Sequence, residues 1–354
     1  MAIRNRANLG CGARHTIYER ALAMEKKQFG NTGLAVSRLT FGCGAVGGLM
    51  TKGAAADQDR AVAWARDHGI NFFDTAASYG DGASEENLGR ALGGTADGLV
   101  ISSKVGIYDT DLANIAGKIT ASLEASLRRL KRDHIDIYQL HNTLGRSDFR
   151  GRLQFNQIID EVIPTFERLR DSGKVRFLGF TAKGEADDIN RLIDTGVFSS
   201  AQVFYNLLVP SAGEPIPAGY PADDFKMLLN TAATKGVGAI GVRVLAGGAL
   251  TGTENRHPLG MPVVAPIGSD TDYATDVRRG LAFMPLVEAG HAASLTELAI
   301  RYVISNPALP TTEIGIATIE ELQYATAAVN KGPLSADALE QIKAIQAGFV
   351  PAAR

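Results

Sequence analysis

The stretch NFFDTAASYG, residues 71–80, decides how the rest of the chain is interpreted. A short apolar run passes into small residues and Gly80, which predicts a buried strand that runs into a loop. Asp74 and Tyr79 stand at the end of that run. An acid at the end of a buried strand costs free energy unless a cation pairs with it. The stretch therefore predicts a basic partner for Asp74.

Two later apolar runs end in residues that extend this set. Residues 99–104, LVISSK, end in Lys104, and residues 135–142, IDIYQLHN, end with His141 and an asparagine. Singly, an Asp, Tyr, Lys or His in such a place is more often a helix cap, a core ring, a solvated amine or a satisfied imidazole. In a parallel barrel, however, the carboxyl ends of the strands converge on one face, where catalytic residues lie. The ordered set at three successive strand ends therefore indicates a single site.

Strand and helix signals alternate along the whole chain. The expected strands are residues 36–41, the runs from 71 and from 135, and residues 99–103, 174–181, 201–206, 238–244 and 313–316. The expected helices are residues 57–68, 84–92, 113–132, 158–172, 186–194, 225–235, 294–305 and 319–329. Eight such pairs predict an α/β fold, a (β/α)₈ TIM barrel in a single domain. A doubly wound sheet with a second domain fits less well, because no linker or shift in composition divides the chain.

A glycine-rich segment after the first strand invites a different fold. Residues 42–48, GCGAVGG, match the G-x-G-x-x-G pattern of dinucleotide-binding folds. That fingerprint requires a helix that begins at once, whereas residues 48–53 are expected to continue as a loop, with a helix only from about Ala56. We therefore interpret the glycines as a loop at the barrel mouth, where the backbone can approach a ligand closely.

Composition excludes several classes of function. The chain of 354 residues is 45% hydrophobic and 21% charged, as in globular enzymes, and its net charge of −2 gives no reason to expect a nucleic acid or membrane partner. No apolar stretch is long enough to span a membrane. Two cysteines form no disulfide framework, which predicts a cytoplasmic protein. No Cys/His cluster has metal-site spacing, so no metal is predicted, and nothing indicates the oligomeric state.

Residues 1–23 differ from the rest of the chain. They contain four arginines against the single acid Glu19, and they lack the apolar core of a secretory signal. A transit peptide is one interpretation. The favoured one is a mobile extension in front of a barrel domain over residues 24–354, with Met24 as the functional start.

The ordered set resembles the aldo-keto reductase superfamily, in particular bacterial members that act on sugars or aldehydes, and the resemblance covers about residues 24–345. The family's Asp-Tyr-Lys-His tetrad corresponds here to Asp74, Tyr79, Lys104 and His141. The resemblance implies an NAD(P)-dependent oxidoreductase that interconverts a small carbonyl compound (an aldehyde, ketone or sugar) and its alcohol. Tyr79 would be the general acid and base, with a pKa that Lys104 brings closer to working pH. Asp74 would hold Lys104, and His141 would orient the substrate oxygen.

The resemblance also implies where the cofactor binds. Gln202 matches the glutamine near the nicotinamide, residues 244–252 match the pyrophosphate loop, and residues 315–318 match the adenosine-phosphate segment. Thr181 keeps the hydroxyl of a Ser-Asn pair after the fifth strand. The residues expected to bind the cofactor are Thr181, Gln202, Arg243, Leu245, Gly247, Gly248, Gly315, Ala317, Thr318 and Glu321.

The choice between NAD and NADP depends on the segment after the eighth strand. NADP is the family habit. Between Gly315 and Asn330, however, there is no Lys or Arg, and Glu320 and Glu321 are acidic. A 2′-phosphate would find no bidentate partner there and would meet like charge. The charges in this segment therefore lean toward NAD.

Two other functions are compatible with the same residues. The chain could be a non-catalytic, cofactor-binding regulatory subunit of the same fold, or a barrel enzyme that uses Lys104 as a Schiff base. The long loops at residues 142–157, 207–224 and 253–276 are expected to act as lids or substrate walls.

Overall fold

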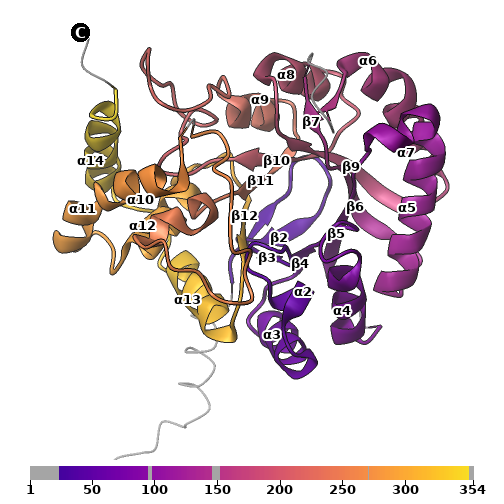
Figure 1. Cartoon of the computed structure of the whole chain (residues 1–354), viewed down its shortest axis with the longest axis horizontal. Coiled ribbons are helices and arrows are strands. Elements are labelled where there is room, and N and C mark those ends of the chain that lie inside the picture. Colours follow the sequence, from indigo (N-terminus) through magenta and orange to yellow (C-terminus); the bar gives the residue numbers. More distant parts are fainter. Residues whose placement is uncertain (1–23, 95–97, 146–151, 270, 351–354) are drawn as a thin grey trace, which may run out of the picture.

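The computed structural model describes residues 24–94, 98–145, 152–269 and 271–350, so the expectation for residues 1–23 lies outside the described part. Eight parallel strands close into a barrel with helices around it (Figure 1). In order around the barrel they are β3 (Leu39–Gly42), β4 (Phe72–Asp74), β5 (Val100–Val105), β6 (Ile135–Leu140), β9 (Val175–Ala182), β10 (Ser200–Phe204), β11 (Gly238–Val242) and β12 (Thr311–Gly315). Strand β12 pairs again with β3, which confirms the predicted (β/α)₈ barrel.

A principal helix follows each barrel strand. These helices are α3 (Ala55–Asp67), α4 (Ala83–Leu92), α5 (Ile115–Leu130), α7 (Ile163–Asp171), α8 (Ala186–Asp194), α9 (Leu228–Thr234), α12 (Leu295–Ser305) and α13 (Ile319–Asn330). Helix α5 illustrates why they form: Ile115, Ile119, Leu123 and Leu127 recur every four residues and are all buried. Such a stripe packs one face of the helix on the barrel. At the start of α12, the Ser294 side chain accepts a hydrogen bond from the Glu297 amide at 3.1 Å and so caps the helix.

Several short elements were not predicted. They are β1 (Lys26–Gln28), α2 (Leu49–Lys52), β7 (Thr143–Leu144), β8 (Arg152–Leu153), α6 (Phe155–Gln157), α10 (Tyr273–Leu281), α11 (Met284–Glu288) and α14 (Ala336–Ala347). The expected strand at residues 36–41 divides into β2 (Ala35–Ser37) and β3. A π-helical turn, Ile158–Val162, joins α6 to α7, and 3₁₀ turns occupy Asp109–Asn114 and Ala246–Thr251.

The expectation that residues 48–53 form a loop is wrong. A one-turn helix, α2, begins directly after Gly48, which has a φ of 91°. The helix forms because it buries Leu49 and Met50 against the core. A helix thus does follow the glycines at once, so the sequence argument against a dinucleotide-binding fold fails. The closed barrel of eight parallel strands excludes that fold instead.

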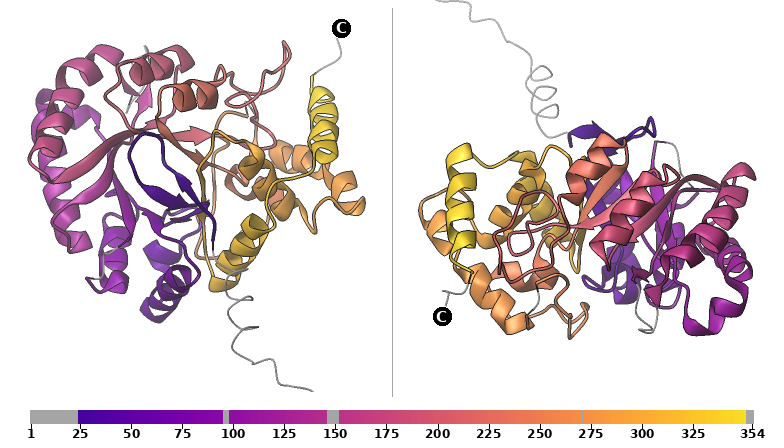
Figure 2. Two further views of the ribbon diagram at one scale, coloured as in Figure 1. Left: turned by 180° about the vertical axis from the view of Figure 1, so that it is seen from behind. Right: turned by 90° about the horizontal axis from the view of Figure 1, so that it is seen from above.

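The hairpin of β1 and β2 covers the amino-terminal end of the barrel, as the view from behind shows (Figure 2). Phe29 at its turn packs edge-on against Phe72, with ring centroids 5.7 Å apart. The apolar layer at this end consists of Phe29, Val36, Phe72, Val100, Ile137 and Ile240. Nearer the carboxyl ends of the strands, buried polar side chains such as Ser102 and Gln139 replace it. Buried polar groups need hydrogen-bond partners, and these lie at the barrel mouth.

The loop at residues 207–224 does not reach that mouth. The hydroxyl groups of Tyr205 and Tyr302 both donate to Glu214 in this loop, at 3.1 and 2.8 Å. Gln346 of α14 donates to the Leu207 carbonyl at 2.9 Å. The loop is thereby fixed against α12 and α14, which lie on the same side of the barrel (Figure 1). Within the described ranges, no helix combines the length and apolarity that a membrane span requires.

Candidate active site

Asp74 and Lys104 form a buried ion pair between the neighbouring strands β4 and β5. Both side chains are fully shielded from solvent. The Lys104 ammonium donates to the Asp74 carboxylate, to the Thr75 carbonyl at 2.8 Å and to the Tyr79 hydroxyl at 3.1 Å. The pair supplies the cation that the buried acid requires, as the sequence predicts.

Two further side chains hold the other oxygen of Asp74. Ser102 Oγ and Gln139 Nε2 both donate to Asp74 Oδ1, the latter over 3.1 Å. Gln139 also donates to Ser102 at 3.2 Å. Because all its partners are buried, the carboxylate has a single fixed orientation toward Lys104.

Tyr79 and His141 lie in front of this pair. The Lys104 ammonium is 4.6 Å from the centre of the Tyr79 ring, and the His141 ring meets the Tyr79 ring edge-on at 5.8 Å. The His141 amide donates to the Val105 carbonyl at 2.8 Å, which ties the end of β6 to the end of β5. The structure thus brings all four expected residues together.

The electrostatics of Tyr79 differ from the expectation. Burial raises the pKa of Tyr79 to about 12; Lys104 acts to lower it, while Asp74 and Glu313 add to the rise. The expectation that Lys104 brings this pKa closer to working pH is therefore wrong for the net effect, because burial outweighs the ammonium. For Lys104 the effect of burial has the opposite sign. Burial acts to lower the pKa of its ammonium, but Asp74, Tyr79 and Glu313 together raise that pKa above its ordinary value. At neutral pH the site holds a protonated phenol beside a charged amine.

His141 is neutral at physiological pH. Burial, with smaller contributions from Lys104 and Lys183, lowers its pKa from 6.5 to about 3. A neutral imidazole can donate one hydrogen bond without adding charge to the site. The structure therefore supports a neutral donor at this position.

The depressed pKa of His141 predicts a pH-dependent stability. The folded protein favours the neutral His141 ring. The resulting contribution to the unfolding free energy is fully present above pH 6.5 and is lost as the pH falls toward 3. One pKa unit corresponds to about 1.4 kcal/mol. Between pH 7 and pH 5, the wild type is expected to lose about 2 kcal/mol of unfolding free energy relative to His141→Asn. Urea unfolding of both proteins at each pH measures this, and a difference that does not change with pH would contradict it.

A cavity of about 940 Å³ opens at the carboxyl ends of the strands, in front of Tyr79 and His141. All the residues expected to bind the cofactor line it except Thr318. Thr318 instead caps α13, where its hydroxyl accepts from the Glu321 amide at 3.3 Å. The loop at residues 207–224, all of which the structure describes, contributes nothing to the wall. The expectation that it forms a substrate wall is therefore wrong for this cavity.

The segment after β11 forms one side of the cavity. Arg243 and Ala246 have positive φ angles of 59° and 48°, and Gly247 and Gly248 follow with 70° and 112°. A Cβ atom at Gly247 would lie 2.6 Å from the Val264 side chain and 3.0 Å from Arg243 Nη1. A side chain therefore does not fit at Gly247, and Gly247 and Gly248 line the cavity with backbone, which suits the close approach of a phosphate group.

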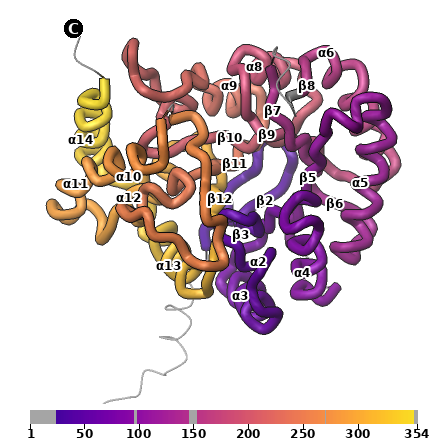
Figure 3. Tube along the Cα trace, viewed as in Figure 1, coloured from indigo at the N-terminus to yellow at the C-terminus, as the bar shows by residue number. Residues whose placement is uncertain are grey.

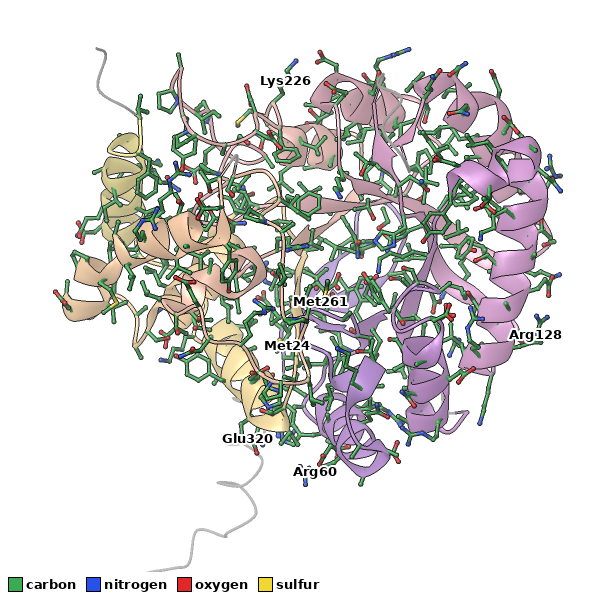
Figure 4. The ribbon with its side chains drawn as sticks, in the orientation of Figure 1. Met24, Arg60, Arg128, Lys226, Met261 and Glu320 are labelled. Atoms are coloured by element: carbon green, nitrogen blue, oxygen red, sulfur yellow. The ribbon has the colours of Figure 1, made fainter. Side chains whose placement is uncertain are left out.

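The following loop crosses toward β3 (Figure 3). Arg256 donates to the carbonyls of Gly247 and Met261, at 2.5 and 2.6 Å, and to Val46 at 3.4 Å. The Met261 amide donates to the Ala45 carbonyl at 3.1 Å, which joins this loop to the loop after β3. Met261 is labelled near the centre of the view in Figure 4. Arg256, which sequence reasoning missed, thus connects three loops at the cavity. A lone basic residue in a long loop provides no sequence signal for this.

Sequence reasoning also missed Ser102, Gln139 and Glu313. All three are polar residues within the barrel strands, at positions that face the interior beside Asp74. That pattern, a polar residue inside an otherwise apolar strand, is a signal that could have identified them.

Comparisons with known proteins agree with this geometry. The model of the Aldo/keto reductase family matches residues 38–347. L-Galactose dehydrogenase of Arabidopsis thaliana is 29% identical over 320 residues, which cover 87% of this chain and 89% of the relative. A probable voltage-gated potassium channel subunit beta of the same plant is 28% identical over 350 residues, 90% and 96% of the two chains.

A solved structure shares the fold over nearly the whole length. An aldo-keto reductase from Bacillus halodurans, in its holo form, superposes with a TM-score of 0.65 at 25% identity and covers 93% of this chain and 97% of its own. The chain therefore belongs to the aldo/keto reductase family of oxidoreductases.

Proposed function

We propose that the protein is an NAD(P)-dependent oxidoreductase that interconverts a small carbonyl compound and its alcohol, with Tyr79 as the general acid and base. One observation carries this proposal: the Tyr79 hydroxyl is 3.1 Å from the buried Lys104 ammonium and faces a large cavity beside a neutral His141. A phenol with an adjacent cation can release its proton during a reaction and take it back.

The bound nicotinamide would supply or accept the hydride at the carbonyl carbon. In the reduction, the Tyr79 O–H bond breaks as the proton passes to the substrate oxygen, and the resulting phenolate lies beside the Lys104 ammonium. His141 donates a hydrogen bond to the same oxygen and orients it. In the alcohol oxidation, the Tyr79 phenolate takes the proton from the hydroxyl group.

The walls of the cavity fit such a cofactor from one end to the other. Thr181 and Gln202, close to Tyr79, would receive the nicotinamide carboxamide. The exposed backbone at Gly247 and Gly248, with Arg243 beside it, would bind the pyrophosphate. The segment from Gly315 to Glu321 at the far side would hold the adenosine portion.

We propose NADH rather than NADPH as the preferred cofactor. The Glu321 carboxylate accepts a hydrogen bond from the Ala317 amide at 2.7 Å, and both residues line the cavity. The positive end of α13 therefore already faces a carboxylate of this chain, and a 2′-phosphate would meet like charge there.

Calorimetric titration with NADH and NADPH side by side checks this preference. We expect the wild type to bind NADH at least about tenfold more tightly, a difference of about 1.4 kcal/mol, and Glu321→Gln to reduce that ratio. Glu340→Gln, on the exposed face of α14, removes a charge elsewhere and is the matched control. A wild type that prefers NADPH would show that a cation outside this segment binds the phosphate.

The structure disfavours Lys104 as a Schiff base. Its ammonium has three N–H donors, and it donates to Asp74, Thr75 and Tyr79. The raised pKa keeps the amine protonated, and the side chain is fully buried behind Tyr79 rather than in the cavity wall. A nucleophilic amine requires a free lone pair and access to the carbonyl carbon.

A regulatory subunit remains the second candidate because the chain is similar to a channel subunit along most of its length. The two functions separate in a turnover assay. Purified protein is incubated with NADH or NADPH and a panel of aliphatic, aromatic and sugar aldehydes, and nicotinamide absorbance is followed. Steady consumption that depends on the aldehyde supports the oxidoreductase. Tight cofactor binding without turnover of any aldehyde supports the regulatory subunit.

A further inference from the structure

Glu313 is an acidic residue inside the barrel that the proposed mechanism does not use. It lies in the middle of β12, between the buried residues Thr312 and Ile314, and its side chain forms part of the cavity wall. Carboxyl groups in such places are retained only with specific partners. Glu313 has partners on two sides.

The first partner is Asp74, one strand beyond the neighbouring strand. In the order β12–β3–β4, Gly42 of β3 pairs with Gly315 on one side and with Asp74 on the other. A Cβ atom at Gly42 would lie 3.1 Å from Glu313 Cγ. The missing side chain therefore lets the Glu313 carboxyl reach across β3 toward Asp74.

The nearby Asp74 affects the charge of Glu313. Two buried carboxyl groups that both carried charge would repel each other, so a neighbouring acid favours the protonated form. Burial and Asp74 raise the pKa of Glu313 well above its ordinary value, and Lys104 opposes them only in part. Asp74 receives the Lys104 ammonium directly and Glu313 does not, which is why burial and Asp74 outweigh Lys104 in the pKa of Glu313.

The second partner is Gln202. Its Nε2 donates to Glu313 Oε2 at 2.9 Å, and its Oε1 accepts from the Thr181 hydroxyl at 3.4 Å. These two contacts fix which end of the amide faces β12. One N–H and one lone pair of the Gln202 amide stay available on the cavity side.

We propose that Glu313 is a positioning residue: its carboxyl connects Asp74 to Gln202 and thereby holds the nicotinamide-binding amide in register with Tyr79 and Lys104. This inference rests on the proposed function, because Gln202 is assigned to the nicotinamide end of the cofactor. Glu313 acts through Gln202 and is not itself assigned a contact with the substrate.

The variants Glu313→Gln and Glu313→Leu test this. Glutamine keeps a donor for Asp74 and an acceptor for Gln202, whereas leucine of similar size keeps neither. Calorimetry compares the binding of the preferred dinucleotide with that of the corresponding ADP-ribose, which lacks the nicotinamide. We expect Glu313→Leu to weaken dinucleotide binding by about tenfold and ADP-ribose binding by less than about twofold, and Glu313→Gln to restore both.

Each outcome decides between a positioning role and a structural one. Unchanged dinucleotide binding in Glu313→Leu, or an equal loss for both ligands, overturns the inference. If Glu313→Leu does not fold, Glu313→Ala, which leaves room for water beside Asp74, is measured in the same way. A wild type that binds neither dinucleotide overturns the proposed function itself, whereas a failure limited to the variants leaves that function standing.

Discussion

Replacing Tyr79 by phenylalanine is expected to lower kcat/KM for aldehyde reduction by about 10²–10⁴-fold, the usual contribution of a positioned general acid. The substitution removes only the hydroxyl, which lies 3.1 Å from the Lys104 ammonium. The ring itself can keep its edge-on contact with His141. Dinucleotide affinity is therefore expected to stay within about twofold.

Steady-state kinetics and calorimetry on the same preparations measure the two effects. Tyr324→Phe is the matched control, because Tyr324 also lines the cavity but its hydroxyl is hydrogen bonded to Ser294 at 2.6 Å rather than to a member of the tetrad. Full activity in Tyr79→Phe would remove Tyr79 as the proton donor. Loss of dinucleotide binding together with activity would indicate a structural role for the ring instead.

Replacing Lys104 by methionine is expected to affect both activity and stability. Asp74 would remain fully buried without its cation, and the loss of one partner of such a pair costs about 3–5 kcal/mol. The phenolate of Tyr79 would also lose the ammonium beside it, so we expect kcat/KM to fall by at least about 10²-fold.

The double variant Lys104→Met/Asp74→Asn separates these effects. Removing both charges leaves no uncompensated ion, so urea unfolding is expected to show that most of the lost stability returns. Activity is expected to stay low, because Tyr79 still lacks its cation. A double variant that regains activity, or one that is less stable than Lys104→Met, would contradict this account of the pair.

The barrel could be predicted because its information is local. Each strand is a short apolar run, and each helix has a periodic apolar stripe such as that of α5. The additional elements carry weaker signals. Helix α2 forms because Leu49 and Met50 become buried against the core. The loop at residues 207–224 packs against α12 and α14, where Glu214 accepts hydrogen bonds from two tyrosines. Tyr302 is 88 positions from Glu214 in the sequence, so the residues around Glu214 alone do not predict this contact.

The tetrad could be predicted because its members end neighbouring strands that follow one another along the chain. Glu313 belongs to the last strand and reaches Asp74 only because the barrel closes and β12 pairs with β3. The direction of the Tyr79 pKa depends on the same closure. Burial and the nearby carboxyl groups outweigh Lys104, and neither can be seen in the residues around Tyr79 alone.

An isotope label tests directly whether the protein transfers a hydride between the cofactor and a carbonyl compound. The protein is incubated with a reactive aldehyde and with nicotinamide cofactor that carries deuterium at the transferable C4 position, and the alcohol is analysed by mass spectrometry. We expect one deuterium on the former carbonyl carbon with wild type, and little or none in the same time with Tyr79→Phe. Bound cofactor and no deuterium in any alcohol would contradict the proposed oxidoreductase activity and indicate a cofactor-binding protein without catalysis.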